Sequence, residues 1–271
     1  METASVPGGQ MAYRDQGAGE PVVLVHGTPS SSNEWRYIIP TLAAHYRVLA
    51  PDLLGFGASS RPADLRIYTL PWHTQNLHAW LAALELSTFH LVVHDFGDPV
   101  ALPLALEQPG RILSLTIIQS WLWDLGAPKS MGGPLMRWLY LSLNLSPRVM
   151  VPLSWGRRTP LTRELRREFL AQFPNRAARA GAFGFARSVA FEGPLLDQLG
   201  QRLDVLSGVP TLVVWGMADR LLRPENLARW RAALPSAAVL ELPDVGHFAQ
   251  LEAPDELVAT IARHLESGRR T

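Results

Sequence analysis

The chain has 271 residues, 47% of them hydrophobic, so it is long enough to bury a substantial core as one domain with an insertion. Its 25 basic and 24 acidic side chains give a net charge of +1, which provides no long-range field toward nucleic acid or an anionic membrane. The absence of cysteine excludes disulfides and thiolate metal sites. We therefore expect a small-molecule partner, no nucleic acid and no membrane.

The first 20 residues are polar and rich in glycine, without the basic start and apolar stretch of a signal peptide. No apolar run approaches the roughly 20 residues of a membrane span. These features predict a cytoplasmic protein. The sequence is compatible with a monomer or a homodimer.

Short β-branched runs alternate with longer amphipathic stretches along most of the chain. This order is typical of a parallel sheet covered by helices. The sequence predicts strands at 22–25, 47–51, 91–94, 113–119, 211–215 and 239–242, a weaker strand at 11–15, and helices at 72–84, 225–233 and 254–265.

The alternation is interrupted between Asp124 and Val205, because about 90 residues separate two consecutive predicted strands there. This stretch contains a helical pattern that begins at Thr159 and Pro160. Ligands bind at the carboxyl ends of the strands in open α/β sheets, so we expect the stretch to form a helical cap over those ends. The predicted division is a core of residues 1–123 and 206–271 and a cap of residues 124–205. The cap helix carries a solvated charged face formed by Arg163, Arg166 and Arg167 with Glu164 and Glu168.

The strand predicted at 91–94 leads directly into Asp95-Phe96-Gly97, which is typical of a sharp strand-turn-helix elbow. A nucleophile on such a turn stands clear of the sheet, and the backbone N–H of Phe96 points to where an oxyanion would develop. Serine suits acyl transfer, whereas a carboxylate suits attack on saturated carbon, which yields an enzyme ester that water hydrolyses. Asp95 is therefore the predicted nucleophile.

Two later motifs supply a base and its acidic partner. Asp219 follows the strand predicted at 211–215, and His247 follows the strand predicted at 239–242. In this arrangement the Asp219 carboxylate accepts the Nδ1 proton of His247 and stabilises the imidazolium that forms when Nε2 takes a proton from water. Asp124 is an alternative for the acid.

A second oxyanion donor is expected in the loop His26-Gly27-Thr28-Pro29, which follows the strand predicted at 22–25. The backbone N–H of Thr28 is the candidate, because Pro29 has no N–H and Gly27 permits a close backbone approach. His26 and His94 are expected to hold loops by hydrogen bonds.

The chain resembles the haloalkane dehalogenases of the α/β-hydrolase superfamily from about residue 10 to residue 265. The resemblance implies a mostly parallel eight-stranded sheet flanked by helices, with an inserted helical cap. It also implies Asp95 as nucleophile, His247 as base and Asp219 as acid, acting on small apolar haloalkanes with water, without cofactor or metal. The resemblance is carried by His26-Gly27-Thr28-Pro29, Asp52-Leu53-Leu54-Gly55-Phe56-Gly57, His94-Asp95-Phe96-Gly97, Trp215-Gly216-Met217-Ala218-Asp219 and Gly246-His247-Phe248.

Two positions depart from the pattern of that family. Dehalogenases usually have tryptophan after the nucleophile, where its indole N–H binds the departing halide, but this chain has Phe96. Many have asparagine where this chain has Thr28. Another side chain must then bind the leaving group, and the candidates are Trp121, Trp123 and Trp155.

Two other functions stay open. An epoxide hydrolase resembles this chain in nucleophile and motif order, but usually carries two cap tyrosines as acids, and the predicted cap holds only Tyr140. The second alternative is a catalytically silent member of the fold that binds a ligand.

Overall fold

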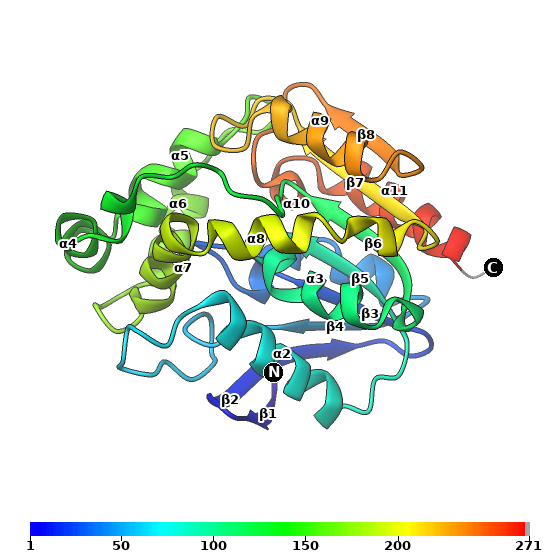
Figure 1. Ribbon diagram of the computed structural model, residues 1–271, viewed down its shortest axis with the longest axis horizontal. Helices are drawn as coiled ribbons and strands as arrows, with labels where there is room; N and C mark the ends of the chain where they lie inside the picture. Colours follow the sequence, from blue (N-terminus) through cyan, green and yellow to red (C-terminus); the bar gives the residue numbers. More distant parts are fainter. Residues whose placement is uncertain (269–271) are drawn as a thin grey trace.

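The computed structural model describes residues 1–268. Their strands form one eight-stranded sheet in the order β1-β2-β4-β3-β5-β6-β7-β8 (Figure 1). β1 and β2 pair antiparallel at one edge, β2 also runs antiparallel to β4, and the remaining pairs are parallel. The predicted α/β-hydrolase architecture is confirmed. The strands are β1 Glu2–Val6, β2 Gly9–Gln16, β3 Pro21–Val25, β4 Arg47–Pro51, β5 Phe89–His94, β6 Ile112–Ile118, β7 Thr211–Gly216 and β8 Ala238–Leu242.

Helices cover both faces of the sheet, so its central strands are buried on both sides and consist of nearly continuous apolar runs. All six residues of β5 are buried, for example. One core packs between the sheet and the helices α2, α3 and α9, and a second packs between the sheet and α1 and α11. These helices are α1 Ile39–Leu42, α2 Leu70–Ala83, α3 Gly97–Glu107, α9 Pro224–Ala233 and α11 Pro254–Gly268, and the short α10 Ala249–Glu252 precedes α11.

The strand β1 was not predicted. Its sequence, Glu-Thr-Ala-Ser-Val, is mostly polar, because β1 lies at the sheet edge with only Val6 buried. Its pairing with β2 and the hydrogen bond from Tyr13 Oη to Glu2 hold it in place. An edge strand with one solvated face has too few apolar residues to be recognised by periodicity.

The long stretch between β6 and β7 forms several helices, of which α4 to α7 gather on the left of Figure 1, while α8 crosses the middle of the view. The helix expected to begin at Thr159 and Pro160 begins instead at Arg163, because Thr162 provides the N-cap and accepts the N–H of Leu165. The cap boundaries at residues 124 and 205 remain a prediction. The inserted elements are η3 Lys129–Gly132, α4 Pro134–Leu143, η4 Ser146–Met150, α5 Val151–Ser154, α6 Arg163–Ala171, α7 Ala180–Phe191, α8 Gly193–Gly200 and η5 Leu203–Leu206.

None of the helices within residues 1–268 has the length and apolar character needed to cross a bilayer.

The start of α3 packs tightly against the end of β3. A Cβ atom on Gly97 would lie 2.3 Å from the Val25 carbonyl oxygen, whereas a Cβ atom on Gly110 would meet nothing within 4 Å. Glycine at position 97 therefore lets the first turn of α3 approach the strand that leads into the Thr28 loop.

We expect Gly97→Ala to lower the free energy of unfolding by about 1 to 3 kcal/mol, because the methyl group must displace backbone atoms. Gly110→Ala is the matched control and should change it by less than about 1 kcal/mol. Urea unfolding followed by circular dichroism measures both. Equal effects of the two substitutions would contradict the close packing of the elbow.

Candidate active site

Asp95 lies on the turn between β5 and α3 and has a left-handed backbone conformation, with φ of 51°. An L-residue adopts this conformation only when its surroundings hold it there. The Asp95 carbonyl oxygen accepts hydrogen bonds from the Ser120 hydroxyl at 2.7 Å and from the Asp98 N–H at 3.2 Å. The turn thus fixes the backbone and directs the carboxylate toward the end of the sheet.

The two oxygens of the Asp95 carboxylate have different surroundings. Oδ2 accepts the backbone N–H of Thr28 at 2.8 Å, and the Phe96 N–H also donates to the carboxylate. Oδ1 lies 3.6 Å from His247 Nε2. The two N–H groups expected from the sequence therefore meet at one carboxylate, and Oδ1 remains directed toward the histidine.

Close backbone approach makes this arrangement possible. A Cβ atom on Gly27 would lie 2.4 Å from the Asp95 Cβ, so a larger residue would push the Thr28 loop away from the carboxylate. Burial raises the pKa of Asp95, while His247, His94 and the two N–H groups oppose that shift.

The His247 ring is held by a buried carboxylate on the side away from Asp95. His247 Nδ1 lies 2.7 Å from Asp219 Oδ2, and Asp219 Oδ1 accepts the Leu221 N–H at 2.7 Å. Burial alone would lower the pKa of His247, but the negative charges of Asp219 and Asp95 outweigh it and raise this pKa to about 9. Asp124 is exposed and accepts the Gly126 N–H, so the alternative acid does not meet the histidine.

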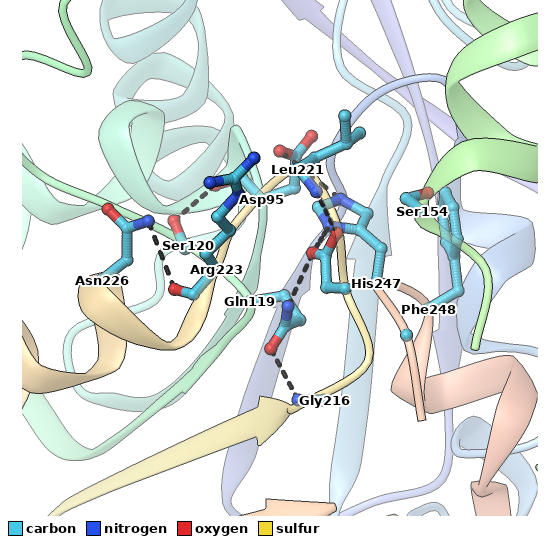
Figure 2. A network of polar contacts seen from close by, with 12 residues as sticks. Asp95, Gln119, Ser120, Ser154, Gly216, Leu221, Arg223, Asn226, His247 and Phe248 are labelled. Atoms are coloured by element: carbon cyan, nitrogen blue, oxygen red, sulfur yellow. Dashed lines mark hydrogen bonds and ion pairs between the residues drawn. The ribbon is translucent and has the colours of Figure 1, made fainter. Parts of the chain in front are cut away.

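Gln119 is a site residue that the sequence did not assign. It follows β6 with a positive φ of 42°, is fully buried, and donates from Nε2 to Asp219 Oδ2 at 2.7 Å. Its Oε1 accepts the Gly216 N–H at 2.6 Å, so the amide lies between the end of β7 and the carboxylate (Figure 2). The available signal was a polar glutamine at the end of the apolar strand predicted at 113–119.

A second chain of polar contacts supports the backbone of His247. His94 Nε2 lies 3.0 Å from the His247 carbonyl oxygen, and His94 Nδ1 lies 3.0 Å from Glu34 Oε1. His26 similarly joins the Gly27 carbonyl to the Leu53 N–H. Both histidines hold loops, as the sequence predicted, whereas the buried Glu34 was not anticipated.

The carboxylate and the histidine face a cavity of about 230 Å³ between the strand ends and the inserted helices. Most of its lining is apolar, and Leu125, Met131, Tyr140, Met150 and Val151 contribute from the inserted stretch. Two polar groups of the lining, Thr28 Oγ1 and Trp121 Nε1, are buried without a hydrogen-bond partner among the described residues. Such a site suits a small apolar molecule that carries one group able to accept hydrogen bonds.

The structure separates the three tryptophan candidates for the leaving-group site. Trp121 lines the cavity and packs its ring edge-on against Phe96, with centroids 4.9 Å apart. Trp123 and Trp155 were wrong candidates, because they lie outside the cavity lining and their N–H groups are already donated. Trp123 bonds Asn226 Oδ1 at 2.9 Å, and Trp155 bonds the Thr159 carbonyl at 2.6 Å.

Comparison with known proteins agrees with this geometry. A family model described as alpha/beta hydrolase fold matches residues 20–254. Haloalkane dehalogenase 2 of Mycobacterium tuberculosis is 31% identical over 261 residues, which cover 93% of this chain and 90% of the relative. A cis-3-alkyl-4-alkyloxetan-2-one decarboxylase of Shewanella oneidensis is 29% identical over 270 residues, which cover 94% and 84%.

Among solved structures, that of a putative ancestral haloalkane dehalogenase, AncHLD2, superposes with a TM-score of 0.87. Its sequence is 26% identical, and the match covers all of both chains. The chain therefore belongs to the α/β-hydrolase family and is a haloalkane dehalogenase-like member of it.

Proposed function

We propose that this protein hydrolyses carbon–halogen bonds of small haloalkanes through an ester on Asp95. The observation that carries the proposal is the asymmetry of the Asp95 carboxylate. Oδ2 accepts the backbone N–H of Thr28, and Oδ1 remains available beside His247 and an apolar cavity. A carboxylate held in this way is oriented for displacement at a saturated carbon.

In the first step, Oδ1 attacks the carbon that bears the halogen. A C–O bond forms as the C–halogen bond breaks, and the halogen leaves with the bonding electrons as halide. Trp121 Nε1 and Thr28 Oγ1 are the fully buried donors of the described cavity lining that lack a hydrogen-bond partner, so we assign them to the halide. Hydrogen bonds to an anion in a dry cavity are stronger than those between neutral groups.

In the second step, His247 Nε2 takes a proton from water, and the resulting hydroxide attacks the Asp95 Cγ. Negative charge then develops on Oδ2, where the N–H groups of Thr28 and Phe96 stabilise it. Collapse of this intermediate breaks the Cγ–Oδ1 bond, and the alkoxide takes the proton from His247 and leaves as alcohol. The proton of the added hydroxyl group then passes to His247 and on to solvent, so Asp95 regains a carboxylate that contains one oxygen from water.

The charges of the site determine at which step the neutral form of His247 becomes available as a base. In the resting enzyme the pKa of His247 is raised to about 9, with the Asp95 carboxylate among its causes. Formation of the ester removes that charge, so the pKa of His247 falls and its neutral form becomes available for the water step.

Epoxide hydrolysis is the second candidate, because Tyr140 on α4 lines the cavity and a phenol can protonate an alkoxide. Burial, together with the Asp95 charge, raises the pKa of Tyr140 to about 12, which makes it a weak acid for this task. The halide reaction needs no proton donor for the leaving group, and the cavity offers two hydrogen-bond donors instead. The geometry therefore favours haloalkanes.

The ester is tested with His247→Phe, which should accumulate it because the base is missing. Intact-protein mass spectrometry after incubation with haloalkanes should show the added alkyl mass, and peptide mapping should place it on Asp95. His45→Phe, at an exposed histidine, is the matched control and should turn over without an adduct. An adduct from epoxides alone would select the second candidate. Wild-type protein inert to both panels, with no adduct in the variant, would instead support a ligand-binding role.

The leaving-group assignment predicts that Trp121→Phe lowers kcat for haloalkanes by about 10- to 100-fold. This range corresponds to the loss of one hydrogen bond to a charged group, about 1.5 to 3 kcal/mol. Halide release measures it, with Trp123→Phe as the matched control, since that indole donates to Asn226 outside the cavity. Equal rates for the two variants would remove Trp121 from the mechanism.

Because the Asp95 charge helps to raise the pKa of His247, we expect this pKa to be lower when Asp95 is neutral. Asp95→Asn imitates the charge of the ester and should lower the pKa of His247 by about 1 to 3 from its value near 9. NMR titration of the histidine measures both proteins. In the wild type, ester hydrolysis should accelerate as pH rises through the lower pKa, because the base must be deprotonated. An unchanged pKa of His247 in Asp95→Asn would contradict the proposal that ester formation makes the neutral histidine available.

A further inference from the structure

The helix α4 presents apolar side chains to solvent. Leu135 is 68% exposed, Trp138 51% and Leu143 47%, whereas Tyr140, on the side of the helix away from Trp138, is buried and lines the active-site cavity. A helix of a soluble protein normally exposes its polar face. The inner face of α4 therefore lines the cavity, and packing within the protein does not explain the apolar side chains of its outer face.

Exposed apolar side chains continue beyond α4 into the next two elements. Val149 in η4 and Leu153 in α5 are 47% and 41% exposed. We call the surface formed by Leu135, Trp138, Leu143, Val149 and Leu153 the outer face of the insertion. These elements form the outermost part of the molecule on the left of Figure 1.

The charge of the chain is divided unequally between this region and the remainder. Residues 134–191, from α4 to α7, contain ten arginines and two glutamates, a net charge of +8. All other residues together contain 15 basic and 22 acidic side chains, a net charge of −7. The small total of +1 is therefore the sum of a strongly basic segment and an acidic remainder. The basic segment attracts anionic surfaces over about one Debye length.

Three arginines lie together beside Leu143. The pKa of Arg179 is lowered by burial and by the charges of Arg148 and Arg176. Arg179 donates to the Leu141 carbonyl at 2.9 Å, which fixes it at the end of α4. A groove of about 250 Å³ is lined by Ser142, Leu143, Asn144, Arg148 and Arg179, and none of these described lining residues is acidic.

We propose that the outer face of the insertion docks on the surface of an anionic lipid bilayer. Leu and Trp side chains enter the interface between head groups and acyl chains, while the arginines bind phosphate groups of the lipids. The groove between Leu143 and Arg148 brings both kinds of contact together. This proposal revises our expectation of no membrane partner, and it does not depend on the reaction proposed above.

Charge and polarity select this occupant over others. A second copy of the chain would bring another basic surface against this one, which like-charge repulsion opposes. Nucleic acid would bind the arginines but would leave the exposed leucines and Trp138 without an apolar partner. An anionic bilayer satisfies both features.

Flotation with unilamellar vesicles tests the proposal on the full-length protein. Binding to vesicles of phosphatidylcholine with 30% phosphatidylglycerol should be at least 10-fold tighter than binding to phosphatidylcholine alone. It should weaken when sodium chloride is raised from 0.05 to 0.5 M, because salt screens exposed charges. Equal binding to the two vesicle types, or no binding to either, overturns the proposal.

Substitutions locate the docking face. Arg148→Gln with Arg176→Gln should weaken vesicle binding by about 30-fold, and Trp138→Ser by about 10-fold or more. Matched controls outside residues 134–191 are Arg231→Gln with Arg263→Gln, and Val205→Ser as the counterpart of Val149→Ser, since the two valines are 42% and 47% exposed. The controls should bind like wild type, and thermal unfolding checks that every variant is folded.

Other occupants give distinct results. Concentration-dependent dimerisation in sedimentation velocity that Trp138→Ser abolishes, without vesicle binding, assigns the face to a second copy and overturns the proposal. Binding of inorganic phosphate at the arginines without vesicle binding reduces it to a small-anion site and also overturns it. If the control pair of substitutions weakens vesicle binding as much as the Arg148 and Arg176 pair does, the assignment to this face is overturned.

Discussion

The contact between the Asp95 carboxylate and the Thr28 N–H is the constraint on which the remaining site depends. It requires two loops from neighbouring strands to approach within 2.8 Å, and Gly27 and Gly97 leave the space for that approach. The same contact distinguishes the two carboxylate oxygens. In the proposed reaction, this difference assigns Oδ1 to the attack on the substrate and Oδ2 to the developing negative charge.

The second constraint is the cost of placing charged groups together away from water. Asp95, His247 and Asp219 are each at most 5% exposed. The charged form of each is therefore stabilised by the charges of the other two and by nearby hydrogen-bonding groups instead of by water. Gln119 and the Leu221 N–H satisfy Asp219, while Glu34 and His94 hold the His247 backbone. Charge and hydrogen bonding are therefore balanced across residues from five separate segments of the chain.

The insertion places one helix between two environments. α4 contributes Tyr140 to the cavity and directs Trp138 outward, so the helix that closes the site also forms the basic, apolar outer surface. Trp121 packs its ring against Phe96 and keeps a buried N–H without a partner among the described residues, which is why we propose it for the role that Phe96 cannot fill. Both features arise where elements from different parts of the sequence meet.

The sequence by itself predicted the alternation of strands and helices, because buried strands and amphipathic helices have different apolar periodicities. It also predicted Asp95, Asp219 and His247, because parallel strands bring residues that follow them to one edge of the sheet. Only the tertiary structure identified Gln119, the Glu34–His94 pair and the choice of Trp121 over Trp123 and Trp155. These depend on which side chains meet after folding, and neither spacing nor composition records whether an indole N–H already has a partner.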